Sequence, residues 1–550
     1  MRTWFAVTVA ALGAFAARGA PEPEEAAAAR AFAALQGGKL DAAGAQSQVR
    51  ALSLALERAG LPETAPVALS VLAAQDGEAA HAASAELQRR AAQGGLALLL
   101  AMRMPPAGFD AALAVRVARA HLEQALVLAP VDEGSAFAGM AGGTGAALTP
   151  VAAGAPVRAA LPEDPAPPRV SAVQRLARAE LERAREIAGQ VPAGDAAEAE
   201  AREVSALAAL AAGDTAAAEQ QFEAVARLAP RGAERRENAL LQLARLAYAR
   251  GDDARSQAMY ARVSRAAPQW LDALFESSWS HFRRGEDEKA LGNLLTLHAP
   301  FFQGRYFPES HVLKALVLYE NCRYADARRA LRDFEARYRP VHDGLAQALQ
   351  VMPTAQAAVD AVASGTLLAR LPEPARAEVV RLLGTPELAL SLRQVTALGA
   401  ELDSVDRRSA AFRGSALASA VVPQVRSSRL DLLQRTGERA RSAVADERGE
   451  LRELLGQSLR LDFEIAGREK ELAAAPPAES SVSQRRPPAQ IEDDEELWPF
   501  QGEYWRDELG SYRFHLGDRC VRPAPVQQAQ VPAPGPAAAA SAEPSPVPAH

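Results

Sequence analysis

The chain has 550 residues, a formal net charge of −7 and an isoelectric point near 5.8. With 49% of its residues hydrophobic, it can bury several cores, either as separate domains or as one array with extensions. The acidic balance excludes the basic footprint that nucleic-acid binding needs, so we expect no nucleic-acid partner.

The first twenty residues, 1–20, have the pattern of a signal peptide. Arg2 supplies the positive start, an apolar run follows at 4–14, and small residues come next. This run is too short to span a bilayer permanently, although an uncleaved N-terminal anchor is an alternative. No cysteine lies nearby for lipid attachment. We expect a periplasmic or secreted protein with no integral membrane span after signal removal.

Residues 21–130 predict degenerate helical hairpins, because apolar residues such as Leu52, Leu56, Leu113 and Val117 fall at helical spacing. Residues 131–170 are rich in Gly, Pro and Ala and predict a flexible linker or a surface excursion. The glycine cluster in this stretch lacks the Lys-Ser or Lys-Thr that follows a phosphate-binding loop.

Residues 171–340 contain a pattern that recurs four times, after a first helix at 171–190. A short loop-opening residue anchors each unit, at 34 to 38 residue spacing: Gly213, Gly251, Gly285 and Cys322. Five residues later the side chain is small in every unit: Ala218, Ser256, Ala290 and Ala327. Nine residues later it is large and apolar or aromatic: Phe222, Tyr260, Leu294 and Leu331. Each unit closes at a proline: Pro230, Pro268, Pro300 and Pro340. A period near 34 residues indicates stacked helical hairpins.

These units resemble the tetratricopeptide repeat (TPR) family. The first unit matches best, from Gly213 and Asp214 to the Leu-Ala-Pro at 228–230, and the others match at Ala244, Asp252 and Tyr324 besides the positions above. The resemblance implies an all-α, tetratricopeptide-type helical-hairpin solenoid whose first helices line a concave groove for other chains. On that alignment the groove residues are Leu241, Arg245, Tyr248, Phe275, Trp279, Phe282, Val312, Leu316 and Tyr319. Ordinary packing within the hairpins is the alternative role for these side chains.

Residues 341–475 predict further helices, ending in a long amphipathic helix over 424–473 that Pro423 begins. Its apolar stripe consists of Val444, Leu451, Leu455, Leu461, Ile465 and Leu472. The stripe is compatible with coiled-coil pairing, but packing against the array is favoured, because the heptad is interrupted.

Residues 476–490 predict a linker, 491–522 an acidic and aromatic segment, and 523–550 a disordered Pro/Ala-rich tail. Six aromatic side chains fall close together in this segment: Trp498, Phe500, Tyr504, Trp505, Tyr512 and Phe514. Exposed aromatics favour aggregation, so we expect the segment to fold back onto the protein's own helices; the alternative is a docking motif for a partner. Our hypothesis places it in the groove, stapled by a Cys322–Cys520 disulfide. Two separate thiols are the alternative for the cysteines.

No catalytic or metal-binding pattern is recognisable. The eight histidines form no i, i+4 pair, and neither cysteine has a neighbour at metal-ligand spacing. We therefore expect no catalytic residues, no cofactor and no metal, and a protein that is not an enzyme.

The third and fourth repeats resemble those of exported TPR proteins of the bacterial adventurous gliding-motility machinery. The resemblance rests on residues 279–285 and 289–292, on 324–327, and on the Trp-Pro-Phe and Gly-Glu-Tyr-Trp motifs after 497. It implies a scaffold that holds other cell-envelope proteins. The alternatives are an adaptor for outer-membrane assembly or cell division, and a peptidoglycan-processing envelope enzyme.

Overall fold

A computed structural model describes residues 22–128, 172–474, 484–485, 495–497, 499–516 and 518–519. Within these ranges the regular secondary structure is helical, apart from one short antiparallel pair formed by β1 (Gln484–Arg485) and β2 (Asp518–Arg519); residues 499–516 are irregular. The expected all-α fold class is confirmed, and the strand pair was not expected. The predicted signal peptide (1–20), the whole 131–170 stretch, most of the predicted 476–490 linker, the predicted tail (523–550), Trp498 and Cys520 lie outside the described residues.

The helices follow one another in three groups along the chain. The N-terminal group is α2 (Glu22–Gln36), α3 (Ala42–Arg58), α4 (Thr64–Ala73), α5 (Glu78–Ala91), α6 (Gly95–Ala101), the 3-10 helix η2 (Pro106–Gly108) and α7 (Ala111–Leu128). The central group is α8 (Ala172–Ala188), α9 (Glu198–Ala211), α10 (Thr215–Leu228), α11 (Glu234–Ala249), α12 (Asp253–Tyr260), α13 (Trp270–Arg283), α14 (Asp287–Leu297), the 3-10 helix η3 (Pro300–Phe302), α15 (Pro308–Glu320) and α16 (Tyr324–Val351). The last group is α17 (Ala355–Ala363), α18 (Thr366–Ala369), α19 (Glu373–Leu383), α20 (Pro386–Val405), α21 (Ala410–Arg413) and α22 (Ala416–Ala474).

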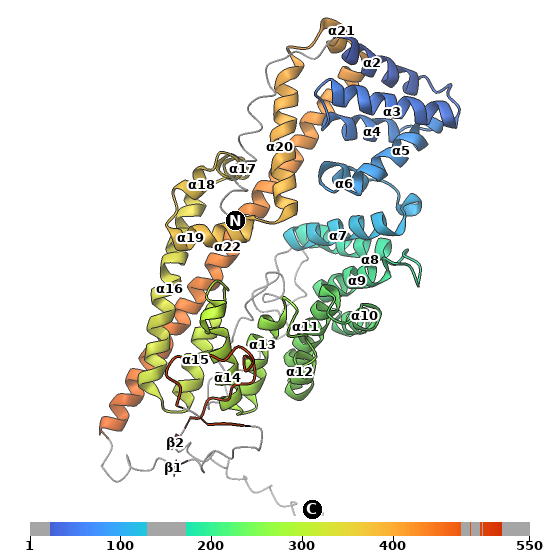
Figure 1. The fold of residues 1–550 in the computed structure, drawn as a ribbon. Helices are drawn as coiled ribbons and strands as arrows, with labels where there is room; N and C mark the ends of the chain where they lie inside the picture. Colours follow the sequence, from blue (N-terminus) through green and yellow to red (C-terminus); the bar gives the residue numbers. More distant parts are fainter. Residues whose placement is uncertain are drawn as a thin grey trace, which may run out of the picture.

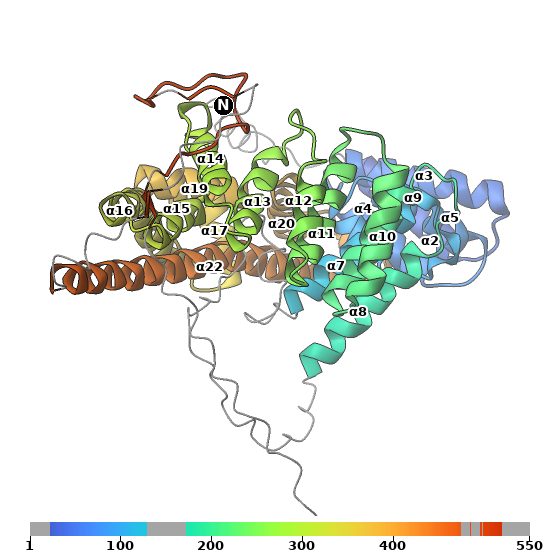
Figure 2. The same cartoon turned by 90° about the horizontal axis from the view of Figure 1, so that it is seen from below.

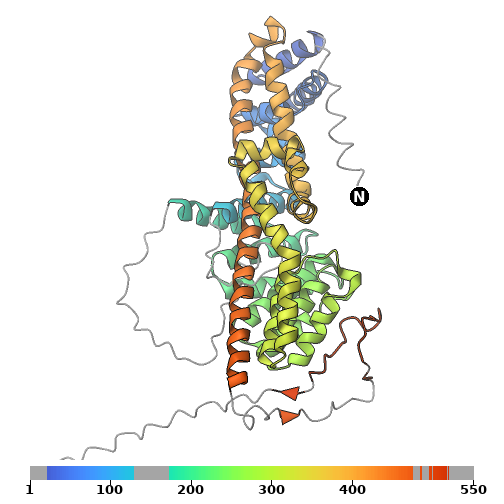
Figure 3. The ribbon, with the colours of Figure 1, turned by 90° about the vertical axis from the view of Figure 1, so that its left-hand side faces the viewer.

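The helices form a curved row that the long helix α22 closes. In Figure 1 the row descends from α2 at the upper right through α12 to α13–α15, and α16 rises on the other side. Helix α22 crosses from the N-terminal helices to the lower left, past α16. Figure 3 shows the same helix running along the length of the helical body. Seen from below, it extends past α15 and α16 toward the N-terminal helices (Figure 2).

The four predicted repeats share one loop geometry. Gly213, Gly251 and Gly285 have φ of 82°, 79° and 72°, and Cys322, at φ 57°, is the one non-glycine residue with positive φ in the described part of the chain. In each loop the next N–H donates to the carbonyl five residues earlier, as from Asp214 to Ala209 and from Arg323 to Leu318. This is a Schellman-type helix end, which favours glycine at the left-handed position. The left-handed conformation costs about 1–2 kcal/mol at Cys322.

The recurring small and large residues lie where helices meet. Ala218, Ser256, Ala290 and Ala327 are 0% exposed. The large side chains nine residues after each anchor are also buried: Phe222, Tyr260, Leu294 and Leu331. The hairpins α9–α10, α11–α12, α13–α14 and α15–α16 therefore pack through the positions that the sequence pattern predicts.

Two predicted helix boundaries are wrong. Pro340 lies inside α16, and Pro423 lies inside α22. A proline in a helix interior costs about 3 kcal/mol, because it removes one hydrogen bond and crowds the preceding turn. Here buried neighbours on both sides offset that cost: Tyr338 and Val341 around the first proline, Val421 and Val425 around the second.

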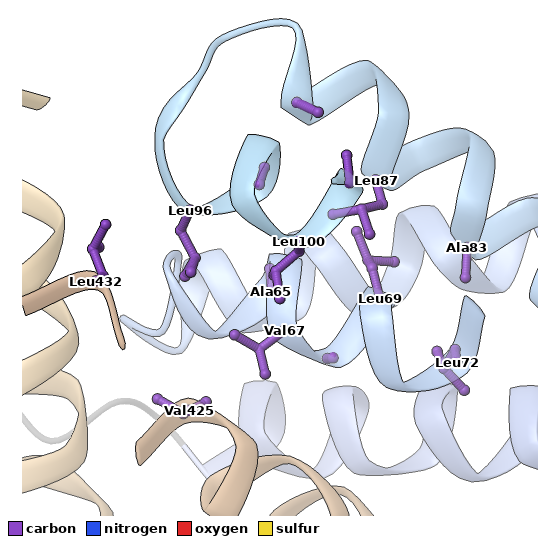
Figure 4. Close-up of a cluster of buried hydrophobic side chains, with 14 of the residues drawn as sticks. Ala65, Val67, Leu69, Leu72, Ala83, Leu87, Leu96, Leu100, Val425 and Leu432 are labelled. Atoms are coloured by element: carbon purple, nitrogen blue, oxygen red, sulfur yellow. The ribbon is translucent and has the colours of Figure 1, made fainter. Parts of the chain in front are cut away.

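The N-terminal and C-terminal groups share one hydrophobic core. Figure 4 shows Val425 and Leu432 of α22 beside the cluster that contains Val67 and Leu96. The same core joins α7 to α8, where His121 and Glu180 are in hydrogen-bond contact at 2.5 Å. Since the helices on either side of 129–171 pack together, the predicted 131–170 stretch interrupts a helical pair and does not separate two domains.

Glu401 of α20 forms hydrogen bonds that link the last group of helices to the N-terminal group. It is buried and accepts hydrogen bonds from the backbone N–H groups of Glu63 at 2.8 Å and Thr64 at 2.9 Å, and from the Thr64 hydroxyl at 2.6 Å. A carboxylate here satisfies donors that the start of α4 leaves unpaired. Burial nevertheless raises the pKa of Glu401 to about 7.

We expect Glu401→Ala to lower the free energy of unfolding by about 2–4 kcal/mol, since buried donors at the start of α4 lose their acceptor. Urea denaturation measures the loss. Asp403→Ala is the matched control, because Asp403 is exposed on the same helix. Equal midpoints for the two variants would contradict the fastening role of Glu401.

Candidate interaction surface

The end of the aromatic segment (residues 491–522) lies on α14, the second helix of the third hairpin. The Gly510 N–H donates to Thr296 Oγ1 at 2.9 Å. The Phe514 N–H donates to the Glu288 carbonyl at 2.9 Å, and the Leu516 N–H to Glu288 Oε1 at 3.2 Å. Residues 509–516 therefore pack against the protein's own helices.

Two glycines allow this close approach. A Cβ on Gly292 of α14 would lie 1.7 Å from the carbonyl oxygen of Tyr512. A Cβ on Gly510 would lie 2.7 Å from the indole ring of Trp270, and Gly510 also has φ 87°. Any side chain at Gly292 would meet backbone, which cannot rotate away. The interface therefore requires a residue without a Cβ at position 292 of α14, which only glycine satisfies.

Apolar side chains of the segment complete the contact. Leu509 and Leu516 are buried, and Leu516 belongs to the same cluster as Leu291 and Leu294 of α14. Arg323, in the loop of the fourth hairpin, donates to the Leu516 carbonyl at 3.1 Å. Burying each leucine contributes roughly 1.5–3 kcal/mol, which offsets part of the cost of ordering the segment, about 1–2 kcal/mol per residue.

The other part of the segment faces outward. Leu497, Phe500 and Trp505 are 59%, 45% and 42% exposed. The Tyr512 hydroxyl accepts from the Trp505 N–H at 2.8 Å and donates to the Trp505 carbonyl at 3.0 Å, which fixes this loop. One end of the segment is therefore docked on the protein, as expected, and the other end is exposed; docking to a partner stays a prediction.

The predicted groove is not an open apolar surface. Leu241, Phe275, Trp279 and Val312 are buried, while Tyr248, Phe282, Leu316 and Tyr319 are half-buried. These side chains contact neighbouring hairpins. The Phe275 and Phe307 ring centroids lie 5.9 Å apart, and the Arg283 guanidinium lies 3.9 Å from the Tyr248 ring centroid.

Arg245 also contacts a neighbouring hairpin, since two of its guanidinium nitrogens, Nε and Nη2, donate to Glu276 at 2.9 and 2.5 Å. The Tyr260 hydroxyl donates to the same carboxylate at 2.9 Å. The described residues 509–516 of the aromatic segment therefore lie on α14 and not in the predicted groove. The predicted groove residues pack between neighbouring hairpins.

Helix α22 covers the first helix of the fourth hairpin. Leu461 and Ile465 are buried in one cluster with Leu313 and Leu318 of α15. Arg328 of α16 donates to Asp462 at 2.8 Å and to Glu469 at 2.9 Å. Val444, Leu451 and Leu455 of the predicted apolar stripe on α22 are buried as well. The Leu472 side chain is not among those that the structure describes. Of the two interpretations of the long helix, packing against the array is the one observed.

Beneath α22 lies a cluster of carboxyl groups with few partners. Glu309, near the start of α15, is 3% exposed, and neither of its oxygens has a hydrogen-bond partner within the described residues. Burial raises the pKa of Glu309 well above its usual value, and Glu450 of α22 acts in the same direction. Burial, with Glu447 as the next cause, raises the pKa of Glu450 to about 8.

Cys322 is disulfide-bonded, and the Tyr324 hydroxyl lies 3.3 Å from its Sγ. The sequence has one other cysteine, Cys520, which lies outside the described residues. The Cys322–Cys520 pairing therefore stays a prediction.

Sequence reasoning missed Leu509, Leu516, Gly292 and Thr296, which form the docking interface. One signal was present: a glycine inside a helix costs about 1 kcal/mol relative to alanine, so Gly292 pointed to a close backbone approach.

Within the described ranges, no group of three or more His, Cys, Asp or Glu side chains is placed to hold a metal ion. None of the helices in those ranges combines the length and the apolar character that crossing a membrane requires. The fold and surface define a protein of stacked helical hairpins, closed by a long helix and carrying a docked aromatic segment. No protein-family model and no curated protein matches the chain.

Proposed function

We propose that the protein is a non-enzymatic scaffold of the tetratricopeptide-repeat type that binds other proteins. The observation that carries this proposal is the shared geometry of four successive hairpins, in which the same loop position is left-handed and the same small residue is fully buried. Stacked hairpins of this kind present extended surfaces to other chains. The exposed side chains of Leu497, Phe500 and Trp505 are apolar groups that a partner could cover.

We place this scaffold in the bacterial cell envelope, in the periplasm or secreted. The support is the signal-peptide pattern of residues 1–20 and the resemblance of the third and fourth repeats to exported proteins of the gliding-motility machinery. On this proposal the protein links components of a large envelope assembly and needs no cofactor. The alternatives are an adaptor for outer-membrane assembly or cell division and a peptidoglycan-processing envelope enzyme.

Crosslinking in intact cells, followed by affinity capture and mass spectrometry under non-reducing conditions, tests the proposal. We expect periplasmic or outer-membrane proteins to be captured, and fewer of them with Phe500→Ser and Trp505→Ser. Capture of cytoplasmic proteins alone would contradict the envelope location. If the variant that combines Phe500→Ser and Trp505→Ser captured the same proteins in equal amount, the exposed aromatic side chains would not be part of the binding surface.

A further inference from the structure

A pocket lies where the docked aromatic segment meets the array. Its volume is about 580 Å³, within the range of sites that hold ligands. Three parts of the chain form its walls: residues 265–271 at the start of α13, residues 301–305 around η3, and the segment itself. We call this the arginine pocket, after its residues Arg265, Arg305 and Arg506.

The arginines give the pocket an excess of positive charge. All three side chains are exposed, and the guanidinium groups of Arg305 and Arg506 make no hydrogen bond or ion pair within the part of the chain that the structure describes. Arg265 donates to the Ser511 hydroxyl at 3.0 Å, which leaves its charge uncompensated. No Asp or Glu is among the described residues that line the pocket, although the charge of Arg305 acts on the nearby carboxyl of Asp272.

Apolar side chains also line the pocket. Trp270 and Phe302 meet edge to face with ring centroids 6.3 Å apart, and Leu509 closes the side that belongs to the segment. Phe301 lines the pocket while remaining 55% exposed. A ligand would therefore insert an apolar group among the rings and present carboxylates to the arginines, because guanidinium pairs well with carboxylate in bidentate geometry.

We propose that the arginine pocket binds an acidic peptide that carries an aromatic side chain, supplied by a partner of the scaffold. This inference rests on the proposed function, since the ligand is part of a partner protein. Charge complementarity selects the acidic peptide, and the exposed Trp505 beside Arg506 extends the contact beyond the pocket. Because Arg506 and Leu509 belong to the docked segment, the pocket is complete only while the segment lies on α14.

Isothermal titration of the full chain with the peptide acetyl-Glu-Glu-Phe-Glu-amide tests the proposal. We expect saturable binding that weakens at least fivefold when NaCl is raised from about 0.05 to 0.5 M, because salt screens exposed charges. The matched peptide acetyl-Gln-Gln-Phe-Gln-amide should bind at least tenfold more weakly. Arg305→Gln and Arg506→Gln should each reduce affinity at least fivefold, whereas Arg426→Gln, an exposed arginine on α22, should not.

Three outcomes would overturn the proposal. Equal binding by Arg305→Gln and the wild type would place the peptide elsewhere. Binding that appears only after the acidic residues 492–496 are neutralised would show that the chain's own acidic run fills the pocket. Self-association that both arginine variants abolish would assign the pocket to a second copy. Circular dichroism verifies that each variant is folded, and the cell-capture experiment can succeed or fail independently of this titration.

Discussion

Replacing Gly292 with alanine should release the aromatic segment from α14. The new Cβ would lie 1.7 Å from the Tyr512 carbonyl oxygen, far inside van der Waals contact. Helix α14 itself should gain up to about 1 kcal/mol, because alanine favours helix over glycine. In this variant we therefore expect α14 to be more stable while the interface between α14 and the aromatic segment is lost.

Hydrogen exchange of the amides in residues 509–516 measures the release. In the wild type the Gly510, Phe514 and Leu516 amides donate to α14. We expect their exchange to accelerate at least about tenfold in Gly292→Ala, since opening then no longer costs the free energy of docking. Gly449→Ala on α22 is the control, because no atom lies within 4 Å of its added Cβ. Unchanged protection in Gly292→Ala would show that the helix shifts to accommodate the methyl group.

The same variant should weaken binding of the acidic peptide, because release removes Arg506 and Leu509 from the arginine pocket. Docking and ligand binding are then coupled through one segment, and each should stabilise the other by the same free energy. Such coupling makes the presence of the arginine pocket depend on whether the aromatic segment is docked.

Local features of the repeats were predictable from the sequence. The positions of Ala218 and Phe222, and of their counterparts, follow from the contact between neighbouring helices, which repeats with the chain. The loop at Cys322 was also located correctly, and its left-handed conformation was found only in the structure. Each of these features depends on residues less than one repeat apart.

Features that depend on distant residues were not predictable. Pro340 and Pro423 indicate helix ends by local rules, but tertiary packing of Tyr338 and Val425 overrides those rules. The groove hypothesis assigned aromatic residues to an open surface, whereas contacts between successive hairpins, such as Phe275 with Phe307, bury them. The aromatic segment docks on α14 because Gly292 leaves room for the segment's backbone. The sequence shows that Gly292 could admit a backbone, but it does not show which part of the chain would approach.

The carboxyl cluster beneath α22 should make the protein less stable as pH rises. Glu450 has a pKa of about 8 in the fold, against 4.5 as its ordinary value. A carboxyl whose pKa is raised by folding contributes stability that is present below its unfolded pKa and lost as pH rises through its folded pKa. Glu309 acts in the same direction. One pKa unit corresponds to about 1.4 kcal/mol, so we expect a loss of roughly 2–5 kcal/mol between pH 5 and 9, after allowance for partial exposure.

Urea denaturation at pH 5 and pH 9 measures this loss, and Glu309→Gln and Glu450→Gln should each reduce it. Glutamine keeps the size of the side chain and cannot ionise, so α15 and α22 no longer have to separate buried charges. Glu464→Gln, at an exposed position on α22, is the matched control and should leave the pH dependence of the wild type. A decline between pH 5 and 9 that is equal in all four proteins would place the titrating groups outside this cluster. If the two variants flatten the curve, the contact between α15 and α22 is the part of the fold that alkaline pH loosens first.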